Sequence, residues 1–189
     1  MLQLEAQEKY SLKIAYGESS QNDMGEILSG NRGAHEESLY VVALDGGYLL
    51  KENMMDLPLD IYLKSALAYF DESQYDAVYE IAIFIKAYWN FDFLDNRIRL
   101  GLGEGLSYTS SILRAEYLEA LAKSDNNSQF LNYIEISADF DIGKLIRTQA
   151  LNDTYIGWAL KHRSGIYGLI NNVRHGGSNY NTLYIERKF

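Results

Sequence analysis

The chain contains no cysteine and only one proline, Pro58, among its 189 residues. The absence of cysteine excludes disulfides, thiolate metal sites and a cysteine nucleophile. A single proline excludes a proline-rich linker or scaffold. The three histidines, His35, His162 and His175, are not spaced like a recognisable metal site. We therefore expect neither a metal nor a cofactor.

Long apolar runs are also missing. The longest are residues 39–44 and 81–85, whereas a membrane-spanning helix needs about 20 consecutive apolar residues. Their absence excludes a transmembrane helix but not a transmembrane β-barrel, whose strands show only an alternation of apolar and polar residues. Basic residues are outnumbered, with a formal net charge of −9, so a nucleic-acid-binding surface is not expected.

Aromatic residues are abundant, with 16 tyrosines, seven phenylalanines and two tryptophans, and an alternation of period two dominates the sequence. In residues 75–89 the odd positions are apolar or aromatic, whereas Asp76, Glu80 and Lys86 occupy even positions. A strand of this length exceeds the usual length in soluble proteins, about five or six residues. It is long enough to cross a bilayer, which takes about 9–11 residues in a tilted strand.

The same alternation recurs along the chain and predicts eight strands. They are residues 9–17, 38–50, 59–70, 75–89, 97–108, 130–142, 155–167 and 179–189. An even strand number at the minimum barrel size is typical of a small closed barrel. The predicted fold class is therefore all-β, with residues 1–189 forming one domain, an eight-stranded antiparallel transmembrane β-barrel with a polar interior.

The charged face of these strands bears on the kind of barrel. A soluble lipocalin-like lipid binder would place the apolar faces inside, whereas a membrane barrel places them outside. The polar faces carry charges of both signs that could pair inside a narrow barrel. These residues are Lys64, Glu80, Lys86, Arg97, Arg99, Glu135, Asp139, Asp141, Lys161 and Arg163. The strand lengths and the aromatic residues at strand ends favour the membrane barrel.

The connections differ in length between the two ends of the predicted barrel. The long connections, residues 17–37, 109–129 and 168–178, share one end. This asymmetry is typical of outer-membrane barrels. One of these connections also has apolar residues at helical spacing, namely Leu113, Tyr117, Leu118 and Leu121. We expect a short helix there that covers the base of the loop rather than a lid.

The first ten residues, MLQLEAQEKY, lack the basic and apolar segments of a secretory signal peptide. We therefore expect either an intracellular protein or a mature chain whose signal peptide is absent from this sequence. The last residue, Phe189, is an aromatic residue that closes the final predicted strand. Such an ending resembles the assembly signal of outer-membrane barrels.

His162 and Ser164 are the residues with the clearest chemical interest. They lie two apart on a predicted strand, so both project to its apolar face, beside Trp158 and Leu160. A base next to a hydroxyl nucleophile forms the first two parts of an acyl-transfer site. The alternative is that this strand end reaches the membrane interface, where water solvates its polar groups.

Four stretches in the second half of the chain resemble a known family. They are RIRLGLGEGLSYTS, FLNYIEISADFDIG, HRSGIYG and the closing GGSNYNTLYIERKF. These stretches resemble the PagL-type lipid A 3-O-deacylases, which are acyloxyacyl-hydrolase-like proteins. The resemblance implies an eight-stranded barrel in the bacterial outer membrane, with an active site on its lipid-facing wall. It also implies a serine esterase that removes an acyl chain from lipid A without a cofactor.

The same resemblance implies the partners. They are lipid A or lipopolysaccharide and the surrounding outer-membrane lipids, with no nucleic acid, and a homodimer is left open. Carried over by position, Ser164 is the nucleophile and His162 the general base. The acid of the family is a glutamate, and Asn179 occupies its position here. An asparagine can hold a histidine by a hydrogen bond, but it does not stabilise the imidazolium by charge.

Gly165 is a second departure, because the family has an asparagine directly after the serine. This change places part of the oxyanion stabilisation at other residues. We expect oxyanion or substrate contacts from Gly165, Asn171, Asn172 and the backbone N–H groups of residues 168–177. The two departures leave a second interpretation open, a catalytically silent outer-membrane barrel with a structural or ligand-binding role.

Overall fold

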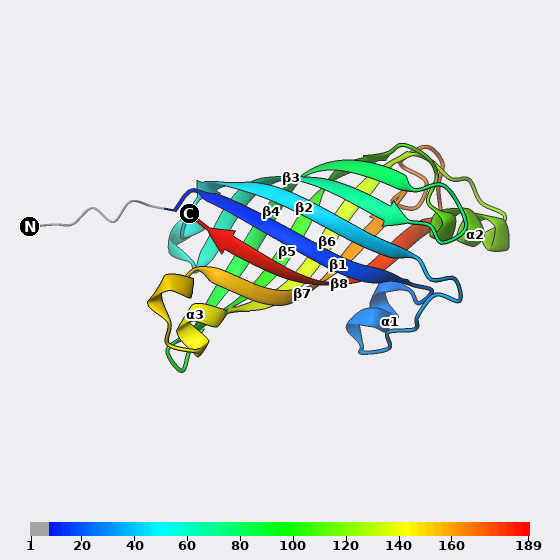
Figure 1. Cartoon of the computed structure of the whole chain (residues 1–189). Helices are drawn as coiled ribbons and strands as arrows, with labels where there is room; N and C mark the ends of the chain where they lie inside the picture. Colours follow the sequence, from blue (N-terminus) through cyan, green and yellow to red (C-terminus); the bar gives the residue numbers. More distant parts are fainter. Residues whose placement is uncertain (1–7) are drawn as a thin grey trace, which may run out of the picture.

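The computed structural model describes residues 8–189 as one closed antiparallel barrel, in which each strand pairs with the next and β8 pairs with β1 (Figure 1). The strands are β1 Tyr10–Ser20, β2 Tyr40–Lys51, β3 Leu59–Asp71, β4 Val78–Phe93, β5 Asn96–Thr109, β6 Phe130–Asp141, β7 Thr154–Ser164 and β8 Gly177–Lys188. The predicted fold class is confirmed. Residues 1–7, which make up most of the N-terminal segment considered above for signal-peptide features, lie outside the described residues.

Short helices occupy the connections. They are α1 Met24–Leu28, η1 Met54–Asp56, α2 Arg114–Lys123, α3 Ile142–Leu145 and η2 Gln149–Leu151. The β1–β2, β3–β4, β5–β6 and β7–β8 connections share one end of the barrel, here called the loop end, and the C-terminus lies at the other (Figure 1). No helix in the described part of the chain is long and apolar enough to cross a membrane.

The expected helix in the β5–β6 connection is α2. Its Glu116 is buried and accepts hydrogen bonds from Arg163 Nη1 at 2.6 Å and from Ser178 Oγ at 2.9 Å. Both donors belong to the barrel wall, on β7 and β8. These bonds anchor α2 to the mouth of the barrel, as expected for a helix that covers the base of its loop.

The observed strand bounds differ from the predicted ones in several places, and two of the differences have a local cause. The strand expected over 155–167 ends at Ser164, because Ile166 and Tyr167 take left-handed φ values of 48° and 53° that start a turn. The strand expected from residue 75 begins at Val78, since the Tyr75 N–H group donates to the Glu72 carbonyl at 3.2 Å within a turn.

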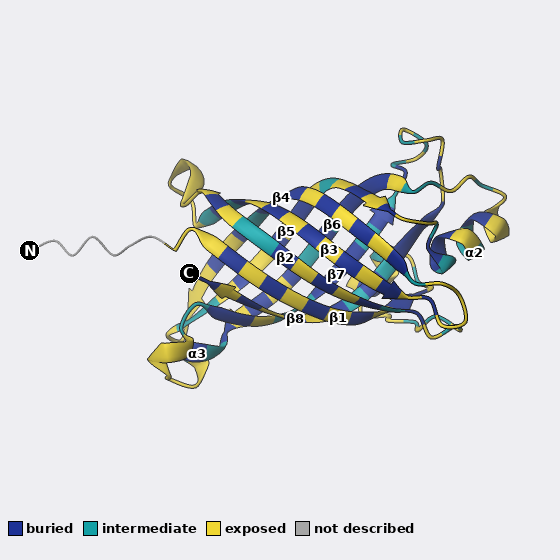
Figure 2. Cartoon of the chain, turned by 45° about the horizontal axis from the view of Figure 1, so that its top comes forward, coloured by how far each residue is buried: buried dark blue, intermediate teal, exposed yellow. Residues whose placement is uncertain are grey.

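Burial alternates residue by residue along most of the strands (Figure 2), with β7 as the main exception. On β1 the apolar side chains of Leu12, Ile14 and Tyr16 are 50–58% exposed on the outer wall, whereas the intervening Lys13 is buried. An apolar exterior around a charged interior is the pattern of a membrane barrel. The lipocalin-like alternative is wrong, because it requires the opposite arrangement.

Ion pairs cross the interior of the barrel. The buried pairs are Lys13 with Asp45 and Glu135, Lys86 with Glu135, Lys64 with Glu186, Arg99 with Asp139 and Glu186, and Lys161 and Arg163 with Glu80. Each charge lies next to an opposite one, which offsets the high cost of removing it from water. Two residues expected in this set behave differently. Arg97 is 31% exposed and pairs with Asp92 at the β4–β5 turn, and Asp141 accepts the backbone N–H groups of residues 144 and 153.

Candidate active site

His162 lies on β7 directly opposite Asn179 on β8, close to the loop end. The neighbours of His162 along the strand, Lys161 and Arg163, point into the barrel and are buried. His162 therefore points outward, and so does Ser164 two residues further along. His162 Nδ1 lies 2.8 Å from Asn179 Oδ1, within hydrogen-bond distance.

Asn179 is itself held in place by the β1–β2 connection. Its Nδ2 donates to the backbone carbonyl of Asn22 at 3.0 Å. Because the amide nitrogen is used in this way, Oδ1 faces His162 as an acceptor, and Nδ1 of the imidazole carries the proton. In a neutral imidazole this tautomer leaves Nε2 free to accept a proton. The contact thus orients His162 as a base.

Ser164 shares a pocket of about 470 Å³ with His162 and Asn179. Within residues 8–189, no hydrogen bond joins the Ser164 hydroxyl to the imidazole. Catalytic hydrogen bonds are often long in unliganded enzymes and tighten when substrate binds. The other residues lining the pocket are Asp23, Met24, Gly25, Glu119, Lys123, Ile134, Ile166, Tyr167, Arg174, His175, Gly176 and Gly177.

The site is more enclosed than a lipid-facing wall. Leu160 has the outward parity of His162, yet it is fully buried, and Ile27 of α1 is 2% exposed. The guanidinium of Arg32 lies 5.2 Å above the Trp158 ring. Figure 1 shows α1 outside the barrel, beside the loop end of β8. The β1–β2 connection therefore folds back over the outer wall of β7 and β8 and forms one side of the pocket.

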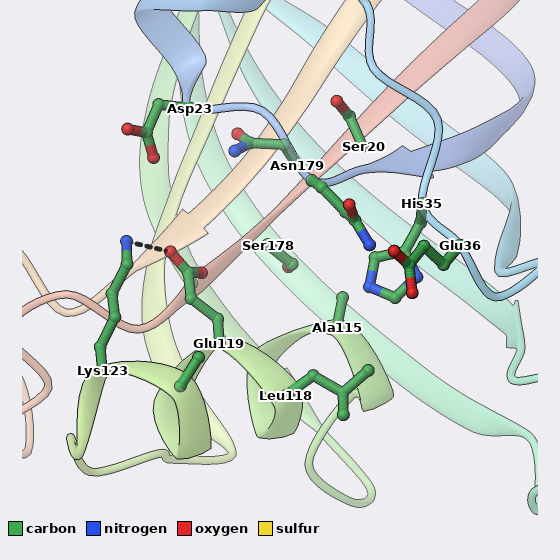
Figure 3. A pocket seen from close by; sticks show the side chains of 13 residues that line it. Ser20, Asp23, His35, Glu36, Ala115, Leu118, Glu119, Lys123, Ser178 and Asn179 are labelled. Carbon is green, nitrogen blue, oxygen red and sulfur yellow. Dashed lines mark hydrogen bonds and ion pairs between the residues drawn. The ribbon is translucent and has the colours of Figure 1, made fainter.

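A second pocket, of about 370 Å³, is also lined by Asn179 (Figure 3). It opens between the β1–β2 connection, which supplies His35 and Glu36, and α2, which supplies Glu119 and Lys123. The last two form an ion pair at 2.7 Å. Because Asn179 lines both pockets, the second pocket adjoins the one that contains His162 and Ser164.

The structure does not bring Asn171 and Asn172 to these residues. The Asn171 side chain donates to Ser128 Oγ at 2.8 Å and to the Phe130 carbonyl at 3.1 Å. The Asn172 carbonyl accepts from Asn126 Nδ2 at 3.2 Å. Neither asparagine lines the two pockets. Their predicted contact with an oxyanion has no support in this geometry.

Gly165 has a packing role. A Cβ on this residue would lie 2.1 Å from the Val173 carbonyl oxygen, so any larger side chain would force the β7–β8 connection apart. The Gly165 carbonyl also accepts from the N–H group of Ile170 at 2.9 Å. An asparagine at this position would not fit the observed loop.

The contribution of the β1–β2 connection to the site is not among the features expected from the sequence. Asp23 and Glu26 have the spacing of a capping box, and the Asp23 N–H group does donate to Glu26 Oε2 at 3.1 Å. This signal could have predicted α1, but not its position over β7 and β8.

Among the described residues, no group of three or more histidines, aspartates and glutamates could hold a metal ion.

A carboxylate clasp holds the β7–β8 connection next to the pocket. Asp125 Oδ2 accepts the backbone N–H groups of Arg174, His175 and Gly176 at 2.8, 2.5 and 3.0 Å. These donors, above all that of His175, lower the pKa of Asp125 to about 2. The clasp should therefore be complete above the ordinary aspartate pKa of about 3.9 and be lost as the pH falls through 2.

Replacement of Asp125 by asparagine should loosen this connection, because an amide oxygen accepts the three N–H groups more weakly than a carboxylate does. We expect faster hydrogen exchange at residues 174–176 at neutral pH, and no further acceleration between pH 4 and pH 2. The matched control is Asp76→Asn in the β3–β4 connection, which should leave this exchange unchanged. Equal exchange in wild type and Asp125→Asn would contradict the clasp.

Comparison with known proteins supports the fold. A scan against models of protein families and a search of curated proteins find no match. Among solved structures, the outer membrane enzyme PagL aligns over 95% of this chain and 99% of its own, with a TM-score of 0.63 and 12% identity. Neisserial surface protein A (NspA) aligns over 97% and 98%, with a TM-score of 0.55 and 14% identity.

The N-terminal β-barrel domain of Pseudomonas aeruginosa OprF aligns over 97% of this chain and 98% of its own, with a TM-score of 0.50 and 12% identity. At these identities the likeness concerns the fold alone. That fold occurs in a named enzyme and also in a surface protein, so it does not by itself identify an activity. The chain thus has the fold of the eight-stranded outer-membrane barrels.

Proposed function

We propose that this protein is a bacterial outer-membrane serine esterase that removes an ester-linked acyl chain from lipid A. The observation that carries the proposal is the hydrogen bond of 2.8 Å between His162 Nδ1 and Asn179 Oδ1, with Ser164 on the same face and in the same pocket. The resemblance of the segment 162–168 to the PagL-type deacylases and the shared fold support the same activity.

In this mechanism Nε2 of His162 removes the proton of the Ser164 hydroxyl as its oxygen attacks the ester carbonyl. His162 then gives the proton to the departing hydroxyl group of the sugar, and water hydrolyses the acyl-enzyme by the same steps. Asn179 keeps the imidazole in the required tautomer. Neither a metal nor a cofactor takes part.

The position of the site suits a substrate embedded in the membrane. The outward-facing aromatic pair Tyr69 and Tyr79 lies near the loop end, with ring centroids 5.7 Å apart. Such residues occupy the boundary between lipid and water in outer-membrane barrels. His162 and Ser164 also lie at the loop end, so the acyl chain can stay in the bilayer while its ester reaches the serine.

A catalytically silent barrel is the second candidate. Two observations favour it: an amide occupies the acid position, and no hydrogen bond joins His162 and Ser164 in the described part of the chain. The fold is compatible with both candidates, because NspA and OprF share it. In this alternative the pocket binds a lipid without cleaving it.

The deciding experiment compares wild type with Ser164→Ala on lipid A, with the products weighed by mass spectrometry. We expect wild type to release one hydroxyacyl chain. In subtilisin the loss of the serine lowers kcat about 2 × 10⁶-fold. An amide at the acid position of a serine protease already lowers kcat by about 10⁴, and Asn179 places an amide there. Dividing the first factor by the second, we expect Ser164→Ala to lower kcat by about a further 10²-fold.

The matched control is Ser65→Ala, since Ser65 is an exposed serine on the outer wall of β3. This control should retain the wild-type rate. Heat-modifiable migration on gels establishes that each variant is folded. If folded wild-type protein releases no acyl chain, the esterase proposal fails and the silent barrel replaces it.

A further inference from the structure

Arg174 lies at the edge of the pocket that holds Ser164, and its guanidinium has no ion-pair partner among residues 8–189. The lysine of this pocket, Lys123 of α2, is already paired with Glu119 at 2.7 Å. Arg174 therefore provides a permanent positive charge in the pocket of the candidate nucleophile, and this charge forms no ion pair within the described residues.

The surrounding chain holds Arg174 in place. Its own N–H group donates to Asp125 Oδ2 at 2.8 Å, as part of the clasp described above. Its side chain lies over Gly168, where a Cβ would be 3.1 Å from Arg174 Cγ. Gly168 also has a φ of 94°, which side-chain-bearing residues rarely adopt. Backbone and side chain of Arg174 are thus both positioned before any ligand binds, which reduces the entropy cost of binding.

The other polar side chains of the pocket suit a polar head group rather than a second acyl chain. Asp23 reaches the pocket from the β1–β2 connection, and His175 reaches it from the same connection as Arg174. A carboxylate can accept hydrogen bonds from sugar hydroxyls, and a guanidinium binds a phosphate through two parallel N–H donors. A ligand that carries an anionic group and several hydroxyl groups would bind to both the Asp23 carboxylate and the Arg174 guanidinium.

We propose that Arg174 binds a phosphate on the head group of the lipid substrate and so positions the ester at Ser164. This inference rests on the proposed function and specifies which lipids the site accepts. Arg174 is a positioning residue in this scheme, because it contacts the head group and not the ester. Lipids that carry the ester but no phosphate should bind weakly.

The test compares lipid A with lipid A whose phosphates have been removed, for wild type, Arg174→Gln and Arg174→Lys. A hydrogen-bonded charge pair corresponds to about a tenfold to hundredfold change in affinity. For Arg174→Gln we therefore expect KM for phosphorylated lipid A to rise by this factor, with kcat nearly unchanged and no effect on the dephosphorylated lipid. Arg174→Lys should recover part of the loss.

The matched control is Arg147→Gln, at the opposite end of the barrel in the β6–β7 connection. It should leave KM unchanged for both lipids. An Arg174→Gln effect of equal size on both lipids would overturn the proposal, since it would indicate a structural role. Excess inorganic phosphate should leave lipid binding in place, and displacement by it would indicate a site for the free anion instead.

Binding measurements separate this inference from the proposed esterase activity. Ser164→Ala protein in detergent should bind phosphorylated lipid A more tightly than the dephosphorylated form, and Arg174→Gln in that background should remove the difference. Phosphate-dependent binding without cleavage by wild type would refute the esterase and retain the phosphate site. Binding that does not depend on phosphate would refute the phosphate site alone.

Discussion

Replacement of Asn179 by glutamate is expected to raise the rate of deacylation by as much as about 10⁴-fold. The reverse change, from the acid to its amide, lowers kcat of a serine protease by about this factor. Asn179 Oδ1 already lies 2.8 Å from His162 Nδ1, so a carboxylate at this position meets the side of the imidazole that must become positively charged. The gain would appear in kcat, because the imidazolium forms only during the reaction.

Two further variants of Asn179 separate charge from geometry. Asn179→Asp keeps the length of the side chain, but it cannot donate to the Asn22 carbonyl as Nδ2 does at 3.0 Å. It should therefore gain activity while the β1–β2 connection becomes more mobile in hydrogen exchange. Asn179→Ala should be slower than wild type, because nothing then orients the imidazole. Unchanged rates in Asn179→Glu and Asn179→Ala would show that a different residue holds His162.

Replacement of Arg99 by alanine is expected to destabilise the folded barrel by about 3–5 kcal/mol, the usual cost of breaking a buried ion pair. Its guanidinium makes two hydrogen bonds of 2.8 Å to Asp139 and one of 2.8 Å to Glu186. It also lies 3.4 Å from the centroid of the Tyr155 ring. Removal of the cation leaves Asp139 without its ion-pair partner inside the barrel.

The free energy of unfolding in urea, measured in detergent micelles, tests this prediction. Arg97→Ala is the matched control, two residues away on the same strand. Its pair with Asp92 is 31% and 66% exposed at the two side chains, and exposed pairs contribute about 0–1 kcal/mol. Similar small losses in both variants would mean that the interior ion pairs do not hold the barrel together.

The charges inside the barrel show why the alternation of apolar and polar residues along each strand predicted which residues share a face. Lys13, Lys86 and Glu135 each occupy the polar parity of their strands and meet at 2.6–2.7 Å inside the barrel. Successive side chains of a strand point to opposite faces, so the local sequence alone assigns each residue to one face. The parity of Arg97 was also assigned correctly. Arg97 is nevertheless partly exposed and pairs with Asp92, because it lies at the β4–β5 turn, and the alternation does not show where a strand ends.

Strand ends and loops depend on contacts between distant segments. β7 stops at Ser164 because the connection after it must turn at Ile166 to pack Gly165 against Val173. The expected oxyanion donors Asn171 and Asn172 instead bond to the β5–β6 connection. Spacing along the sequence does not reveal such pairings, since they depend on which loops meet at the end of the closed barrel.

The sequence by itself determined the number of strands, the division of each strand into two faces, and the shared face of His162 and Ser164. These follow from the period of the strand, which is a local property of the backbone. Only the tertiary structure decided that Asn22, far away in sequence, fixes Asn179, that the β1–β2 connection lies over the outer wall of β7 and β8, and that Asp125 holds the backbone of Arg174. Closure of the barrel brings these loops together, and the fit between them is set by three-dimensional packing that no local pattern encodes.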